Sequence, residues 1–188
     1  MYPPEVGVIG TSLIRFQPNQ DTSTFYGNTD DGELFFADWY TKKSEEGGKS
    51  DMVKEIWSSF KSFRPTVNLD ISPFFDDVLL SVYESNFVIW KSDCTDPIFQ
   101  SPTIDKTYIT CGFFSPTRPG VIYIGRSDGQ IDIWDFMDQS NFPTQQHPVV
   151  AIGISSMMIN RKEPDLLAVG DKDGCLHLLK LPTNLIRP

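Results

Sequence analysis

Short apolar runs recur along the chain, and each predicts a β-strand. Four of them hold the same place in a repeating pattern, at residues 34–38, 87–91, 131–135 and 176–180. In Ile131-Asp132-Ile133-Trp134, apolar and polar positions alternate, which is typical of a strand with one buried face.

A tight turn precedes each of these four strands. The turns are Asp31-Gly32, Glu84-Ser85, Asp128-Gly129 and Asp173-Gly174. Glycine accepts a positive φ without steric cost, so Asp-Gly between two apolar runs predicts a β-hairpin. Successive turns lie 53, 44 and 45 residues apart, which indicates a repeat of about 44 residues.

Two further strands precede each turn. The nearer strands lie at residues 24–27, 78–83, 121–125 and 166–170. The farther strand ends on proline in three repeats, at Phe16-Gln17-Pro18, Ile71-Ser72-Pro73 and Phe114-Ser115-Pro116. We place its end in the fourth repeat at Ile154-Ser155-Ser156, where no proline stands. Proline has no N–H to donate to a neighbouring strand, so it suits the end of a strand. With its successive strands joined by short turns, each repeat is predicted to form an antiparallel meander.

The outer strands of the repeats are the weakest part of the pattern. Residues 97–100 and 143–146 are candidates, and residues 52–60 form either one amphipathic turn or an outer strand. Residues 41–51 are polar, charged and glycine-bearing, so they predict a solvated loop that explains the long first interval.

A meander of this size cannot bury both of its faces alone, and stacking such units around an axis gives a β-propeller. We therefore expect an all-β partial propeller of about four blades, at residues 7–60, 61–102, 103–146 and 147–182, with 183–188 beginning a C-terminal tail. Four repeats do not make a closed ring of this kind. The end blades are expected to expose apolar faces, with the remaining blades supplied by upstream sequence or by another chain.

The composition narrows the class of partner. The 188 residues include 16 Lys plus Arg against 25 Asp plus Glu, a net charge of −9. An acidic chain is a poor ligand for nucleic acid or anionic membranes, so we expect a protein partner. Aromatic residues make up 13% of the chain, far more than in disordered chains. There is no 18-residue apolar run and no secretory signal, and three widely spaced cysteines form no disulfide framework, which favours a cytosolic protein.

Several fragments resemble reactive or metal-binding motifs but fail on closer inspection. Gly48-Lys49-Ser50 lacks the earlier glycine of a phosphate-binding loop, since Lys43 stands there. Asp171-Lys172-Asp173-Gly174 begins like a calcium-binding loop, but Cys175 stands at the next ligand position and no Glu completes the loop. We therefore interpret this segment as a hairpin turn. The two histidines, His147 and His177, are not clustered with cysteines or carboxylates at ligand spacing. We therefore expect no enzyme activity, no cofactor and no metal.

The repeat resembles the WD-repeat pattern, because a period of about 44 residues is combined with a Ser-Pro pair, an Asp-Gly turn and a terminal Trp-Asp pair. Trp134-Asp135 has the full terminal pair, whereas Trp90-Lys91 and Ala37-Asp38 each have half of it. More specifically, the chain is similar over residues 6–185 to the C-terminal propeller of dynein intermediate chains. The most specific phrases are Ser115-Pro116-Thr117-Arg118-Pro119 and Asn86-Phe87-Val88-Ile89-Trp90. They are closest to the intermediate chain of the axonemal inner-arm, two-headed dynein.

The chain also departs from the WD pattern. No Gly-His dipeptide precedes any inner strand, and the first and fourth repeats lack the tryptophan. The His–Ser/Thr–Trp–Asp hydrogen-bond network of many WD blades is therefore expected to be incomplete.

The resemblance implies a non-catalytic scaffold of a ciliary or flagellar axonemal dynein. Its propeller would dock on the dynein heavy-chain tail, beside a second intermediate chain and light chains, in the cytoplasm, cytoskeleton and axoneme. The alternative is a cytosolic WD-repeat adaptor of a non-motor complex, in trafficking or ubiquitin ligation; an enzyme built on a propeller is a more distant third. An acidic turn surface would suit a basic partner.

The candidate residues follow from their places in the repeat. The expected blade-core residues are Trp90, Trp134, Phe114 and Ile71. The partner-facing candidates, on the turns or on the segments before the inner strands, are Arg64, Lys106, Asp128 and Asp173.

Overall fold

The computed structural model describes residues 10–16, 23–38, 53–57, 66–160 and 162–186. Within these residues the chain forms strands β1 to β15 and one short helix, α1 (Thr183–Ile186), so the all-β prediction is confirmed. Arg64, the Gly48-Lys49-Ser50 fragment and the 41–51 insertion lie outside the described residues.

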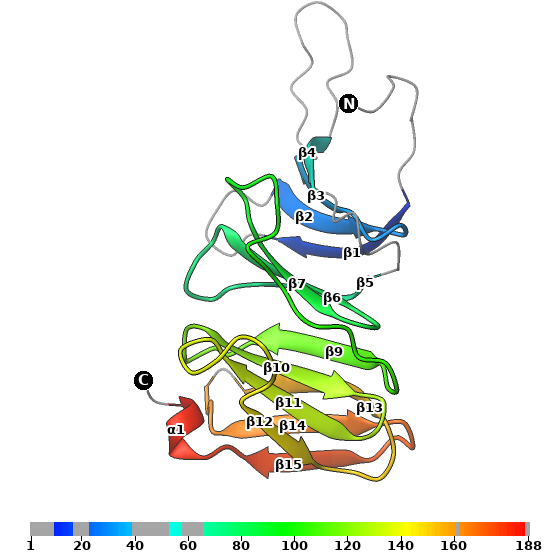
Figure 1. Ribbon diagram of the computed structural model, residues 1–188, viewed down its shortest axis with the longest axis vertical. Coiled ribbons are helices and arrows are strands. Elements are labelled where there is room, and N and C mark those ends of the chain that lie inside the picture. The colour runs from blue at the N-terminus through cyan, green and yellow to red at the C-terminus, as the bar shows by residue number, and fades with distance from the viewer. Residues whose placement is uncertain (1–9, 17–22, 39–52, 58–65, 161, 187–188) are drawn as a thin grey trace, which may run out of the picture.

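The strands form four antiparallel sheets, which we number as blades 1 to 4 in chain order (Figure 1). Blade 1 has β1 (Thr11–Phe16), β2 (Thr24–Thr29), β3 (Leu34–Asp38) and β4 (Val53–Trp57). Blade 2 has β5 (Thr66–Ile71), β6 (Val78–Tyr83), β7 (Phe87–Lys91) and β8 (Phe99–Gln100). The strand β4 resolves the choice left open for residues 52–60 in favour of an outer strand.

Blades 3 and 4 differ in their number of described strands. Blade 3 has β9 (Ile109–Phe114), β10 (Val121–Arg126), β11 (Gln130–Asp135) and β12 (Gln145–Pro148). Blade 4 has only β13 (Ile154–Ile159), β14 (Leu166–Asp171) and β15 (Leu176–Lys180). The limit of 146 expected for the third blade was too early, because Pro148 pairs with Gln130 and the outer strand follows β11 to its first residue.

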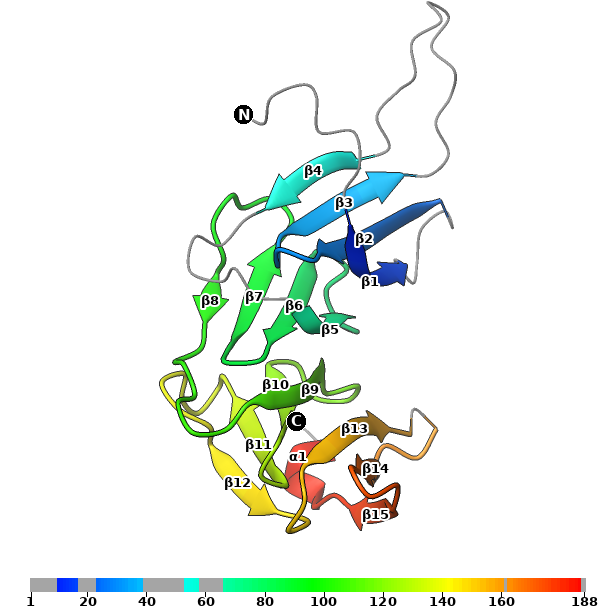
Figure 2. The same cartoon turned by 90° about the vertical axis from the view of Figure 1, so that its right-hand side faces the viewer.

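The blades are arranged as an open arc (Figure 2). The first strands of successive blades contact one another, β1 with β5, β5 with β9 and β9 with β13. The outer strands β4, β8 and β12 follow the opposite, convex side of the arc (Figure 2). This is the arrangement of propeller blades around part of an axis.

Period-two alternation in the middle strands builds the core between blades. In β6, Leu79 and Tyr83 join the cluster with blade 1, whereas Leu80 and Val82 join the cluster with blade 3. All four side chains are buried. The middle strand of an enclosed blade is therefore apolar on both faces, as its continuous apolar run predicts.

Polar side chains on β5 also join blade 2 to blade 3. Asn68 Nδ2 donates to the Gly112 carbonyl oxygen at 2.6 Å, and the Phe114 amide donates to Asp70 Oδ2 at 3.0 Å. A Cβ at Gly112 would lie 2.6 Å from Ile124 Cδ1 and 3.3 Å from the Tyr123 carbonyl oxygen, so the close strand approach requires glycine there.

The expected end of the inner strand in blade 4 was wrong. β13 begins at Ile154 and ends at Ile159, so Ser155 and Ser156 lie near its start. The equivalent of Ser72 and Ser115 is Asn160. All three amides donate to the first residue of the next strand, and their side-chain oxygens accept a hydrogen bond from an amide two residues on. Without a Ser-Pro pair, the sequence offers no marker for this position.

Candidate protein-interaction surface

The hairpin turns gather at one end of the blades, which we call the turn face. Three of them have glycine at positive φ: Gly32 (86°), Gly129 (80°) and Gly174 (84°). The second turn is closed differently, with the Tyr83 amide donating to the Asn86 carbonyl oxygen and without a positive-φ residue. Glu84 and Ser85 therefore hold the turn position that the repeat predicts without a glycine.

The segment that leads to the next blade covers the turn of the preceding blade. The amides of Ile104 and Ile109 donate to the Ser85 and Glu84 carbonyl oxygens, and the Val149 amide donates to that of Gly129. The equivalent turn of blade 4 has no such cover among the described residues.

The two Asp-Gly turns of blades 3 and 4 show this difference directly. A Cβ at Gly129 would lie 2.0 Å from the Val150 carbonyl oxygen, whereas a Cβ at Gly174 would meet no atom within 4 Å. Asp173 is exposed beside Gly174, and Asp128 is half-buried beside Gly129.

The structure brings three of the partner-facing candidates to one part of the turn face. Tyr108, two residues after the exposed Lys106, connects them. Its amide donates to Ser127 Oγ, beside Asp128, at 3.0 Å. Its hydroxyl and its ring both contact the ammonium of Lys172, which precedes Asp173, with the ring centre 4.7 Å from Nζ.

A charged pair crosses the hairpin of blade 3. Arg126 Nη2 lies 2.6 Å from Asp128 Oδ2, and Arg126 Nη1 lies 3.3 Å from Asp132 Oδ1. Gln146 Nε2 donates to the same Asp132 oxygen at 2.9 Å. Burial raises the pKa of Asp132 against these favourable partners. Asp128 is thus engaged within its own blade.

Blade 4 has a hydrogen-bonded pair at the equivalent positions, with the carboxylate on the second strand instead of the third. Six residues separate Asp171 from His177, as they separate Arg126 from Asp132, and Asp171 Oδ2 lies 2.8 Å from His177 Nε2. The hydrogen bond to His177, followed by the amide of Cys175, lowers the pKa of Asp171. Neither pair was predicted, although ionisable residues six positions apart across an Asp-Gly turn were a usable signal.

Ion pairs also recur at the far end of the hairpins in blades 2, 3 and 4, at equivalent positions in each blade. The last residue of the third strand pairs with the segment before the second strand, as Lys91–Asp77, Asp135–Arg118 and Lys180–Asp165. The Arg118–Asp135 pair, at 2.7 Å, is the most buried of the three, with side chains 24% and 10% exposed. Arg118 also donates to the Asn184 carbonyl oxygen, so it holds α1 against blade 3.

The predicted core residues lie between blades. Trp90 is buried between blades 1 and 2, with Ile71 partly buried against the same cluster. Trp134 and Phe114 are buried between blades 2 and 3. The indole Nε1 of Trp90 is buried and makes no hydrogen bond within the described part of the chain.

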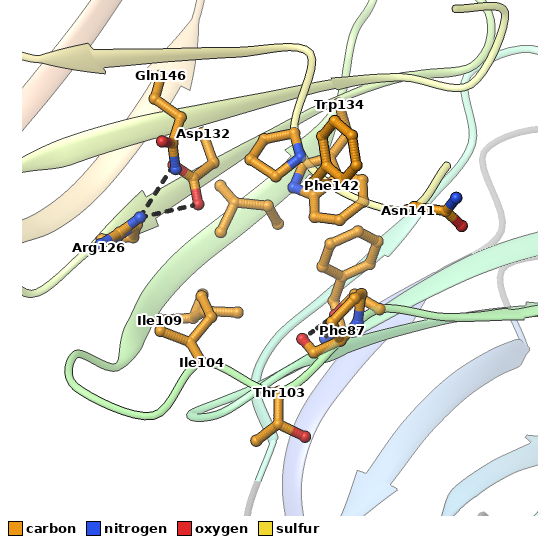
Figure 3. A pocket seen from close by; sticks show the side chains of 14 residues that line it. Phe87, Thr103, Ile104, Ile109, Arg126, Asp132, Trp134, Asn141, Phe142 and Gln146 are labelled. Carbon is orange, nitrogen blue, oxygen red and sulfur yellow. Dashed lines mark hydrogen bonds and ion pairs between the residues drawn. The ribbon is translucent and has the colours of Figure 1, made fainter. Parts of the chain in front are cut away.

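A pocket of about 140 Å³ opens between blades 2 and 3 (Figure 3). Phe87, Ile104 and Ile109 form one wall, and Trp134 and Phe142 face them. At one end, Figure 3 shows the polar group of Arg126, Asp132 and Gln146. The sequence pattern did not mark this pocket, because its walls come from five different strands and two connecting segments.

Within the described part of the chain, Cys111 and the two histidines have separate surroundings. Burial raises the pKa of the Cys111 thiol to about 11, which disfavours the nucleophilic thiolate. His177 is hydrogen-bonded to Asp171, and Nε2 of the exposed His147 lies 3.3 Å from Gln145 Oε1. Among the described residues, no three His, Cys, Asp or Glu side chains are placed to hold a metal. The described part of the chain also contains no helix with the length and hydrophobicity to span a bilayer.

The outer face of blade 4 is apolar and uncovered in this structure. Met158, Leu178 and Leu176 are 73%, 68% and 68% exposed. Met158 pairs with Ala168, and Ala168 pairs with Leu178, so these side chains form one row across the sheet. An apolar row of this kind indicates a packing surface.

Four-stranded meanders with inner strands in contact and Asp-Gly hairpins at a period of about 44 residues define part of a WD40 β-propeller. The family described as "Dynein axonemal intermediate chain 3 WD40 domain" matches residues 8–181. The chain therefore belongs to the WD40 region of the axonemal dynein intermediate chains, as the sequence resemblance predicted.

Individual relatives agree with this assignment. The chain is 37% identical to human dynein axonemal intermediate chain 3 over 177 residues, which cover 92% of the chain and 20% of that protein. It is 30% identical to the ciliary dynein intermediate chain 3 of Heliocidaris crassispina, over 94% of the chain and 28% of the relative. It is 28% identical to the 70 kDa intermediate chain of the flagellar outer arm of Chlamydomonas reinhardtii, over 94% and 30%. The chain thus spans between a fifth and a third of these relatives.

Proposed function

We propose that the chain is the propeller part of an axonemal dynein intermediate chain and acts as a non-catalytic scaffold that docks on the dynein heavy-chain tail. The observation that carries this proposal is the family match over residues 8–181. The location follows from the names of the relatives, which are axonemal, ciliary or flagellar. The partners in the same complex would include a second intermediate chain and light chains.

We place the complex in the inner dynein arm. The phrases at residues 86–90 and 115–119 favour this placement. Identity to the relative whose name includes the outer arm is lower, at 28% against 37%.

The remaining blades of the propeller would pack on blade 4. Its exposed row of Met158, Ala168 and Leu178 has the character of the inter-blade surfaces elsewhere in the arc. A cavity of about 340 Å³ between blades 3 and 4, lined by Ile133, Val149 and Leu179 among others, lies on the opposite, covered side of blade 4 and is not part of this row. The remaining blades would come from other sequence of the same protein or from another chain.

The turn face is the proposed docking surface for the heavy chain. It presents Lys106 and Asp173 as exposed charges on either side of the Tyr108–Lys172 contact. Such exposed charges favour recognition and association rate more than they contribute affinity.

The test is co-purification of a heavy-chain tail fragment with the full intermediate chain. A Lys106→Glu/Asp173→Lys double variant should reduce recovery several-fold at low salt. The matched control, Lys162→Glu/Glu163→Lys, makes the same charge changes in the connection before β14, at the opposite end of the blade. Stable recovery of a non-motor assembly without any heavy chain would favour the adaptor alternative instead.

A further inference from the structure

Blade 2 has an aromatic loop tip that blades 3 and 4 lack. Phe74 and Phe75 lie between β5 and β6, at the end of the blade opposite the turn face. Their side chains are 41% and 55% exposed. The equivalent loop positions in blades 3 and 4 are polar, with Thr117 and Arg118 in blade 3 and Lys162 and Glu163 in blade 4.

The fold does not require these two rings. Ser72 Oγ accepts hydrogen bonds from the amides of Phe74 and Phe75, at 3.3 Å each. Ser115 Oγ accepts from the amides two and three residues after it in the same way, so the loop closes through its backbone whichever side chains it carries. Neither ring joins the core clusters of the described residues. An exposed pair of this kind indicates a contact surface.

Carboxylates lie beside the aromatic tip. Asp76 and Asp77 follow it directly, and the Ser92 amide donates to the Asp77 carbonyl oxygen at 2.9 Å, so the connection from β7 to β8 lies next to the loop. Lys91 Nζ lies 3.6 Å from Asp77 Oδ2 and 2.5 Å from Asp93 Oδ2, and the aspartate side chains are 45% and 62% exposed. Because Lys91 is the only cation of the two segments, this end of blade 2 is net negative.

Exposed phenylalanine rings beside net negative charge suit one kind of side chain in particular. The planar guanidinium of arginine stacks on aromatic faces and forms paired hydrogen bonds with a carboxylate. The lysine ammonium is more strongly hydrated and cannot form the paired contact. The negative charge disfavours nucleic acid and anionic lipid as occupants, so the surface fits a cationic polypeptide.

We propose that the aromatic tip and its neighbouring carboxylates bind an arginine-rich, amphipathic segment of a partner polypeptide. Its guanidinium groups stack on Phe75 and pair with Asp93, and its apolar side chains cover Phe74. Arginine is prominent among the residues that dominate interface affinity. This surface lies at the opposite end of the blades from the turn face, so a scaffold that docks through the turn face keeps it open for a second partner.

The test measures the affinity of the 188-residue chain for two labelled synthetic peptides by fluorescence anisotropy. One is an amphipathic helix of leucine and arginine, and the other has the same sequence with lysine in place of every arginine. The arginine peptide should bind about fivefold more tightly or better, because the two peptides differ only in stacking and in paired hydrogen bonds.

Substitution of the two rings tests the aromatic part of the surface. Phe74→Ser/Phe75→Ser should weaken the arginine peptide about tenfold, since both the cation–π contacts and the apolar cover are lost. The matched control, Met137→Ser/Phe142→Ser, removes two apolar side chains that are 81% and 60% exposed in blade 3. It leaves the charge unchanged and should not alter the affinity.

A second pair of variants tests the carboxylates. Asp77→Asn/Asp93→Asn should weaken the arginine peptide about threefold or more and reduce the salt dependence of its binding. Asp105→Asn/Asp138→Asn removes the same charge at two exposed aspartates away from the tip, so it should have little effect. These variants test the surface by themselves if the serine substitutions lower the melting temperature.

Equal losses in the tip variants and their controls would show that the peptide binds the acidic chain in general, and would overturn the proposal. Equal affinity for the arginine and lysine peptides would overturn it as well. The heavy-chain test uses variants of the turn face, so failure of either proposal leaves the other standing.

Discussion

Blades 3 and 4 are built on the same plan but differ in what covers them. Both have an Asp-Gly turn, a hydrogen-bonded side-chain pair six positions apart across the hairpin and an ion pair at its far end. Blade 3 is covered on both faces, by clusters shared with blade 2 and with blade 4. Among the described residues, blade 4 is covered only on the face toward blade 3. The comparison therefore distinguishes two kinds of feature. A blade forms its turn and its side-chain pairs from its own sequence, but it needs a neighbouring blade to cover each apolar face.

The middle strands show that blade 4 is nonetheless composed for two neighbours. In β10, Ile122 faces blade 2 and Tyr123 faces blade 4. In β14, Leu167 and Val169 face blade 3, while Leu166 and Ala168 alternate with them on the other side. Both strands are apolar on both faces, but among the described residues only β10 packs against a neighbouring blade on each face.

The largest contrast should come from two identical substitutions in blade 4. Leu167→Ala removes a side chain that is 1% exposed, so it should lower the free energy of unfolding by about 2–5 kcal/mol. Leu178→Ala, at a side chain that is 68% exposed, should change it by less than about 0.5 kcal/mol. Urea unfolding of both variants checks this, and equal losses would show that the outer face is already packed.

The turns should give the next contrast. Gly129→Ala places a methyl group against the Val150 carbonyl oxygen in addition to the positive-φ strain, so the loss should exceed about 2 kcal/mol. Gly174→Ala meets no neighbouring atom and should lose only the strain, about 1 kcal/mol. Thermal unfolding of both variants measures the difference. Similar losses would mean that the segment over the blade 3 turn moves to accommodate the added methyl group.

The far-end ion pairs should differ by less. Arg118→Ala leaves Asp135 buried without its partner and releases α1, so it should lower stability by about 1–2 kcal/mol. Lys180→Ala breaks a pair in which the lysine side chain is 79% exposed, which should have an effect within about 0.5 kcal/mol. Chemical unfolding at low and high salt checks both values. A strong salt-sensitive loss for Lys180→Ala would contradict this ranking.

The pKa shifts of Asp132 and Asp171 predict opposite responses to acid. Asp171 has a lowered pKa, so its stabilising contribution holds above the ordinary aspartate pKa near about 3.9 and is lost as the pH falls through the lowered value. Asp132 has a raised pKa, so its ionisation opposes folding, and the protein gains stability from it as the pH falls from the raised value toward about 3.9.

Replacing each aspartate by asparagine should therefore change the pH dependence of stability in opposite directions. Asp171→Asn should remove a loss on acidification, and Asp132→Asn should remove a gain. Urea unfolding between pH 3 and pH 7 measures both, with Asp173→Asn on the exposed turn as the control. A common direction for the two variants would contradict the assigned causes.

The repeat could be predicted from the sequence because turns and strand periodicity are local signals. The three Asp-Gly turns and the two-sided apolar runs of β6 and β10 lie where the pattern places them. Outer strands were less certain, since β8 has only two residues and β12 reads Gln-Gln-His-Pro with no apolar alternation. The inner strand of blade 4 was misplaced because Asn160, not a Ser-Pro pair, follows it.

The interaction surface was harder to predict, since it depends on residues that are distant in sequence. Tyr108 joins Ser127 and Lys172 only because the turns of blades 3 and 4 lie beside it. The pocket likewise needs Phe87 and Trp134 from two blades. Candidate residues such as Lys106 and Asp173 could be placed on one face by the repeat, but their contacts could not.

The central claim is that the outer face of blade 4 is a packing surface that further propeller blades cover in the assembled protein. Hydroxyl-radical footprinting of two exposed methionines tests it, because sulfur oxidation follows exposure. Met158 on that face and Met137 in blade 3 are 73% and 81% exposed in this chain. In the full protein, Met158 oxidation should fall about tenfold or more while Met137 stays reactive. Equal oxidation of both in the full protein would contradict the account.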